Sequence, residues 1–97
     1  MEINVKSLKF NADQKLLDFV QKKVSRLSKF FEGIDTVDVT LSLLKVPDNK
    51  GVKLQTRVLG QDLLISRNAK TFEDAVTVAV DAMKESIVRA KEKVTET

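Results

Sequence analysis

The chain has 97 residues, of which 42% are hydrophobic and 32% charged, a balance typical of one folded domain with a single core. It contains no cysteine and no histidine, which excludes disulfides, thiolate metal sites, cysteine nucleophiles and imidazole general bases. The 17 basic and 14 acidic residues leave a net charge of only +3, so the distribution of charge must decide whether the protein binds a polyanion.

Residues 2 to 10 predict a first strand, because Ile3 and Val5 alternate with polar neighbours. Asn11 is then the predicted N-cap of a helix that runs to Phe31, and Gly33 follows as a C-terminal signal. The apolar residues of this segment recur at helical spacing: Leu16, Val20, Val24, Leu27 and Phe31.

A period-two pattern predicts three further strands in an antiparallel meander. Apolar residues alternate with polar ones from Val37 to Leu43, and again from Val52 to Val58 after the turn-forming run from Pro47 to Gly51. The chain turns near Gly60 into a last strand around Leu63, Leu64 and Ile65.

A second long helix is predicted to begin at Thr71-Phe72-Glu73-Asp74, which resembles a capping box. Its apolar stripe runs from Phe72 to Val94, and residues 95 to 97 are expected to fray. The predicted fold is α+β, a two-layer sandwich of βαβββα order in which two long helices pack on one face of a four-stranded sheet. Residues 1–97 form one domain in this interpretation, and the place of the first strand in the sheet stays open.

Basic residues gather on one flank of the first helix. A projection at roughly 100° per residue places Lys15, Lys22, Arg26 and Lys29 within an arc of roughly 60°, with Lys23 at its opposite-handed edge. No acidic residue falls within the arc, so the stripe is a candidate surface for a polyanion. A solvated helix flank is the other interpretation.

The second helix sorts its charges by side. Lys84 and Lys91 lie on one flank and Arg89 and Lys93 on the other, while the acidic residues gather at the back: Asp74, Asp81, Glu85 and Glu92. A weaker candidate is the outer sheet face, where Lys6, Lys53 and Arg57 stand among polar residues and Asp38. The phenylalanines are expected in or at the edge of the core.

No catalytic constellation emerges. The aspartate pairs Asp13/Asp18 and Asp35/Asp38 stand at ordinary spacings, without a nucleophile, a histidine or a glycine-rich phosphate loop beside them. The sequence has neither an apolar run of about 18 residues nor the charged start and apolar centre of a signal peptide. We therefore expect a cytoplasmic protein that is not an enzyme, with no cofactor, no metal site, no small-molecule substrate and no membrane partner.

The order of elements resembles the family of ribosome hibernation-promoting factors and ribosome-associated inhibitors, also known as sigma factor modulation proteins. The segment from Leu16 to Leu27 is similar to the first helix of that family, and Phe30-Phe31 and Ile34-Asp35 follow it. The stretch from Phe72 to Lys93 corresponds to the second helix. The family commonly opens that helix with Asp, a hydrophobic residue, Tyr and then Ala-Ile-Asp, whereas this chain reads Thr-Phe-Glu-Asp-Ala-Val-Thr, so contacts of the tyrosine and second aspartate are not carried over.

The resemblance implies a short-form factor, without a C-terminal dimerisation domain, that sits in the decoding channel of the small ribosomal subunit. There it would exclude messenger and transfer RNA and promote hibernation. The expected partner is small-subunit rRNA, and the free protein would be a monomer or a weak dimer. The predicted RNA-binding residues are Lys15, Lys22, Lys23, Arg26, Lys29, Lys84, Arg89, Lys91 and Lys93. A generic double-stranded RNA binder and a protein-interaction or transcription-factor modulator remain as alternatives.

Overall fold

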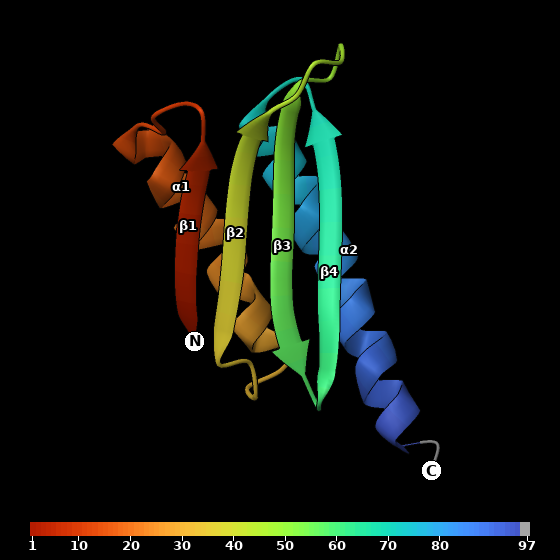
Figure 1. The fold of residues 1–97 in the computed structure, drawn as a ribbon. Helices are drawn as coiled ribbons and strands as arrows, with labels where there is room; N and C mark the ends of the chain where they lie inside the picture. The colour runs from red at the N-terminus through yellow and green to blue at the C-terminus, as the bar shows by residue number, and fades with distance from the viewer. Residues whose placement is uncertain (96–97) are drawn as a thin grey trace.

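Four strands form one sheet, and two helices cover one of its faces (Figure 1). The computed structural model describes the backbone of residues 1–95 and the side-chain environments of residues 1–93. The elements in chain order are β1 (Glu2–Leu8), α1 (Gln14–Ser25), the 3-10 helix η1 (Arg26–Lys29), β2 (Thr36–Leu43), β3 (Lys50–Val58), β4 (Gln61–Ala69) and α2 (Phe72–Thr95). This arrangement confirms the predicted two-layer α+β sandwich.

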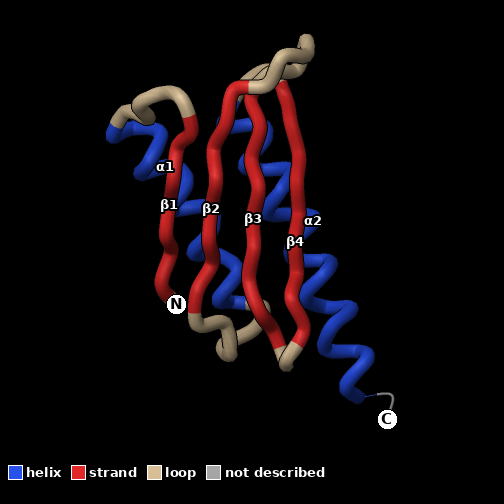
Figure 2. Tube along the Cα trace, in the orientation of Figure 1, coloured by secondary structure: helices blue, strands red, loops and turns tan. Residues whose placement is uncertain are grey.

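The sheet has the order β1-β2-β3-β4, so that β1 lies at an edge beside β2 (Figure 2). The two strands run parallel, with Ile3 opposite Val37 and Val5 opposite Val39, because α1 returns the chain to the starting end of the sheet. The other neighbours are antiparallel. Leu59 and Gly60, with φ of 52° and 77°, form the two-residue turn between β3 and β4, a conformation that suits the twist of a hairpin.

The first helix begins and ends differently from the prediction. Asp13, and not Asn11, is the N-cap, and its Oδ1 accepts a hydrogen bond of 2.8 Å from the backbone amide of Leu16. Asp13 stands three residues before Leu16, where a side-chain oxygen reaches that amide, whereas Asn11 lies too far back along the chain. The α-helix stops at Ser25 and tightens into η1, so the predicted continuous helix to Phe31 is wrong.

The core lies between the sheet and the two helices. It joins the stripe of α1, that of α2 and the inward residues of β2 and β3; fully buried members include Val20, Val24, Leu27, Val37, Leu41, Leu54, Met83 and Ile87. Thr56 is the buried polar exception, and its hydroxyl donates to the backbone carbonyl of Thr36 at 2.6 Å. Leu43, placed inward by its alternation, is the last residue of β2 and is exposed.

The second helix begins as predicted, since the Thr71 hydroxyl accepts a hydrogen bond of 3.1 Å from the Asp74 amide. Phe72 in its first turn stacks on Phe10, with ring centroids 5.0 Å apart, and this contact ties the start of α2 to the loop between β1 and α1. Of the predicted frayed end, residues 96 and 97 lie outside the described residues, as does the side chain of Val94. Within the described chain, no helix has the length and apolar character that crossing a membrane requires.

Candidate nucleic-acid interface

A groove of about 220 Å³ lies between the end of α1 and the middle of α2. We call it the interhelical groove, and its lining residues are Lys23, Arg26, Lys29, Phe30, Thr77, Val80, Asp81 and Lys84. Four of these eight residues are cationic and one is acidic. Three of the cations come from α1 and η1, while α2 contributes Lys84 beside Asp81, and the excess of cations gives the groove a positive potential.

The 3-10 geometry of η1 brings Arg26 and Lys29 to the same side. In an α-helix, residues three apart differ in direction by roughly 60°, whereas in a 3-10 helix with three residues per turn they eclipse each other. Because η1 starts at Arg26, Lys29 projects in the same direction as Arg26, toward α2. Lys23, which the projection set at the opposite-handed edge, lies in this groove as well.

Phenylalanine rings position several of the lysines. The Lys84 ammonium of α2 lies 4.4 Å from the ring centroid of Phe30, and the Lys23 ammonium lies 5.6 Å from that of Phe19. Lys91 donates a hydrogen bond of 3.0 Å to the backbone carbonyl of Phe30, beyond the end of η1. These contacts hold the ammonium groups at the groove while Lys84 and Lys91 stay exposed to a partner.

The cations of the first helical segment have no partner of opposite charge among the residues that the structure describes. Lys15, Lys22, Arg26 and Lys29 are all exposed, and within the described chain none has a carboxylate at ion-pair distance. The cationic flank that the sequence predicted is therefore neither buried nor neutralised. It is a surface on which phosphates can replace mobile counterions.

The nine predicted RNA-binding residues do not form a single site. Lys23, Arg26, Lys29 and Lys84 line the interhelical groove, and Lys91 stands next to it. Lys15 and Lys22 are exposed on α1 outside the groove lining. Arg89 and Lys93 lie on the other flank of α2, over Gln61 and Leu63 of β4.

The acidic residues of α2 are sorted less cleanly than the sequence suggested. Glu85 and Glu92 stand with Val88 on the exposed back of the helix, as expected. Asp81, predicted at the back, instead lines the interhelical groove. Sequence reasoning also did not identify Phe30 as a groove residue, although its position just after the basic run and its 36% exposure fit that role.

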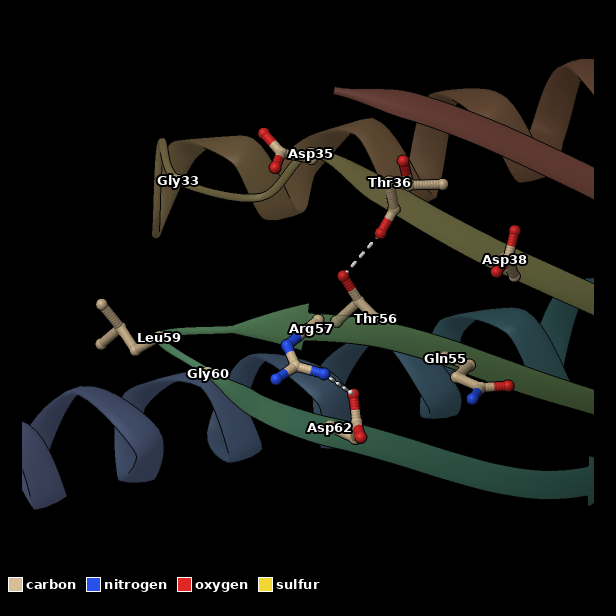
Figure 3. Close-up of a pocket in the computed structure, with 10 residues that line it drawn as sticks. All are labelled: Gly33, Asp35, Thr36, Asp38, Gln55, Thr56, Arg57, Leu59, Gly60 and Asp62. Carbon is tan, nitrogen blue, oxygen red and sulfur yellow. Dashed lines mark hydrogen bonds and ion pairs between the residues drawn. The ribbon is translucent and has the colours of Figure 1, made fainter.

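The far face of the sheet, which no helix covers, carries a larger hollow of about 440 Å³ (Figure 3). Asp35, Asp38 and Asp62 line it together with Arg57, whose guanidinium pairs with the Asp62 carboxylate at 3.3 Å. This hollow is net acidic and therefore unsuited to a polyanion. Among the described residues, no group of three or more acidic, cysteine or histidine side chains is arranged to hold a metal ion.

Comparisons with known proteins agree with this architecture. The chain is 23% identical over 93 residues to a ribosome hibernation promoting factor of Azotobacter vinelandii, a match that covers 96% of this chain and 85% of the relative. Its fold is similar to the N-terminal domain of Thermus thermophilus Protein Y, with a TM-score of 0.79 at 22% identity over 92% of this chain and 98% of that domain. It is also similar to a ribosomal subunit interface protein of Coxiella burnetii, with a TM-score of 0.86 at 14% identity over 95% and 99% of the two chains.

The two structural matches concern the fold alone, and the family follows from the sequence. The family model described as Sigma 54 modulation protein / S30EA ribosomal protein matches residues 3–95, from the first strand to the last turn of α2. With nearly the whole chain matched, this protein belongs to the Sigma 54 modulation protein / S30EA ribosomal protein family.

Proposed function

We propose that this protein is a cytoplasmic, ribosome-associated translation inhibitor that binds small-subunit rRNA through the interhelical groove. Bound in the decoding channel, it would exclude messenger and transfer RNA by occupying their space and so promote ribosome hibernation. The single observation that carries the proposal is the groove itself, in which Lys23, Arg26 and Lys29 face Lys84 across two helices. The name of the Azotobacter relative supports the same role.

The mechanism requires no bond-making chemistry. Each groove cation that meets a phosphate releases condensed counterions, and this release supplies affinity that falls as salt rises. The cationic flank runs from Lys15 to Lys29, about 20 Å at 1.5 Å per residue, which is long enough to contact several phosphates. The two helices are fixed on the sheet by a shared core, so the groove meets folded RNA as a rigid shape.

Co-sedimentation with purified small subunits across a salt series tests the proposal. The variant Arg26→Ala/Lys29→Ala removes one arginine and one lysine from the groove. The matched control Arg89→Ala/Lys93→Ala removes the same two residue types from the other flank of α2. We expect the groove variant to flatten the slope of log affinity against log salt by about 1.4 to 1.8, from about 0.7 to 0.9 per lost phosphate contact. The control should keep most of the wild-type slope.

Three outcomes would contradict the proposal. Wild-type protein that does not sediment with small subunits at low salt would exclude ribosome binding. Equal losses in the groove variant and the control would mean that binding follows total charge and not the groove. Binding to free RNA duplexes as tight as to small subunits would favour a generic double-stranded RNA binder. Displacement of labelled messenger RNA from small subunits by the wild-type protein is the direct measure of the exclusion step.

A further inference from the structure

The uncovered face of the sheet, here called the open face, is divided into an internally paired half and a cationic half. In the first half, the Asn4 amide donates to Asp38 at 3.2 Å, and Arg57 pairs with Asp62 at 3.3 Å. Arg57 neutralises Asp62, whereas Asp38 gains a hydrogen bond but keeps its charge, and all three residues line the acidic hollow of Figure 3. The opposite half lies toward the end of the sheet where the β2–β3 hairpin closes, and its residues Lys6 and Lys53 have no carboxylate at ion-pair distance among the described residues.

The cationic half is organised by strand register. Lys6 of β1 pairs with Thr40 of β2, Thr40 pairs with Lys53 of β3, and Lys53 pairs with Ser66 of β4. Side chains of paired residues point to the same face, so these four form one row across the sheet, which we call the lysine row. Its two ammonium groups stand on strands about 10 Å apart, with a hydroxyl between them and another at the β4 end.

A hollow of about 230 Å³ lies beside the lysine row because Gly51 has no side chain. Gly51 stands between Ser42 and Asn68 in the next row, and a Cβ there would lie 3.0 Å from the Ser42 hydroxyl oxygen. The lining also includes Lys53 and Thr40, with Leu8 and Leu44 as exposed apolar walls. None of the residues that line this hollow is acidic.

We propose that the lysine row and its hollow form a second RNA-binding surface, which holds a phosphodiester backbone of ribosomal RNA on the layer opposite the interhelical groove. The inference rests on the proposed function, because it requires that RNA surround the bound domain. Lys6 and Lys53 contact phosphates, and the hydroxyls of Ser42 and Thr40 hydrogen-bond ribose 2′-hydroxyl groups beside them. Strands β1 to β4 contain no aromatic residue, so this surface contacts the backbone without stacking on bases.

Two features favour RNA over an acidic protein segment as the occupant. Hydroxyl groups that both donate and accept suit the 2′-hydroxyls of ribose, whereas carboxylates accept only. The lysine row also runs across the four strands, whereas a peptide added as a strand at the β1 or β4 edge would run along them. The domain would then be held between two RNA segments, one against each of its layers.

Lys53→Ala and Arg57→Ala form a closely matched pair for the test. Both residues are exposed on the open face of β3, four positions apart, but Arg57 is paired with Asp62 and Lys53 has no carboxylate at ion-pair distance in the described chain. In the small-subunit salt series we expect Lys53→Ala to flatten the slope by about 0.7 to 0.9, and Lys6→Ala/Lys53→Ala by about twice that amount. Arg57→Ala should keep the wild-type slope.

The outcomes separate this inference from the proposed function. If Arg26→Ala/Lys29→Ala weakens binding while Lys53→Ala behaves as Arg57→Ala does, the second surface is excluded and the groove stands. If only the Lys6→Ala/Lys53→Ala variant weakens binding, the groove is excluded and the second surface stands. If wild-type protein does not bind small subunits, both fall.

A photo-crosslinking amino acid at Ser66 identifies the occupant, because Ser66 is exposed at the β4 end of the lysine row. Irradiation of the complex between this variant and small subunits should give an adduct that ribonuclease digestion shortens. An adduct that resists ribonuclease would identify a protein neighbour and overturn the assignment to RNA. The absence of any adduct, under conditions in which the same amino acid at Thr77 of the interhelical groove crosslinks, would overturn it as well.

Discussion

Replacing Arg26 tests whether repulsion between like charges on the basic flank destabilises the free protein. Lys22, Lys23 and Lys29 stand four, three and three residues from it, and no carboxylate of the described chain pairs with it. Like charges at these helical spacings destabilise by about 0.2 to 0.5 kcal/mol each, so three such neighbours amount to about 0.6 to 1.5 kcal/mol. Arg26 also caps the carboxyl end of α1, where a cation is favourable by about 0.3 to 1 kcal/mol.

The balance of these two effects predicts that Arg26→Gln stabilises the protein at low salt. The midpoints of the two ranges leave a net gain of about 0.4 kcal/mol, which raises the melting temperature by about 2 to 3 °C at about 4 to 8 °C per kcal/mol for a domain of this size. At about 1 M salt the Debye length falls to about 3 Å and both effects are screened, so the difference between variant and wild type should shrink toward zero.

Thermal unfolding followed by circular dichroism at about 10 mM and about 1 M salt measures this difference. The control is Arg57→Gln, which breaks an exposed ion pair and should lose between about 0 and 1 kcal/mol. A lower melting temperature for Arg26→Gln at low salt would refute the reasoning, because it would show that the guanidinium is compensated in the free protein. A stabilised variant that binds ribosomes more weakly would show that the flank is retained for binding and not for folding.

Three further predictions concern the local structure that places the helices, and urea unfolding measures each of them. Asp13→Ala should cost about 1 kcal/mol because the helix N-cap is lost, while Asn11→Ala should cost nothing measurable; the reverse order would restore Asn11 as the cap. Thr71→Ala should also cost about 1 kcal/mol through the cap of α2, and an unchanged midpoint would contradict the hydrogen bond to Asp74. Gly60→Ala should cost about 1 to 2 kcal/mol through its φ of 77° alone, since no atom lies within 4 Å of the added Cβ; a neutral result would contradict the turn geometry.

The sequence was sufficient to predict the order of the elements, because each helix and inner strand buries a regular stripe against one core. It failed at the ends of α1. Asn11 and Asp13 are both good N-cap residues, and only the position of the first amide that needs a partner decides between them. The change to 3-10 geometry at Arg26 cannot be recognised from the spacing of the apolar residues, because Leu27 fits a buried position in either geometry.

The candidate site was predicted only in part for a related reason. Periodicity shows which side chains share a flank of one helix, but not how two helices are rotated and spaced on a sheet. That Arg26 and Lys84 line one groove, and that Arg89 lies outside it, follows from packing in the second layer. Periodicity also does not show which residues of different strands share a row on the open face. Lys6 and Lys53 lie in one row only because β1 pairs with β2 in the observed register.

A net charge of +3 is compatible with the proposed binding to RNA because the positive and the negative charges gather on separate surfaces. The interhelical groove and the lysine row gather cations, while Asp35, Asp38 and Asp62 gather at the opposite end of the open face from the lysine row. An acidic patch contributes nothing to affinity for a polyanion, but it penalises every orientation that would bring it against phosphate. Under the proposed function, attraction on two surfaces and repulsion on a third would select one orientation in a channel whose walls are RNA. Evenly scattered positive charge would attract the same RNA without fixing how the domain lies in it.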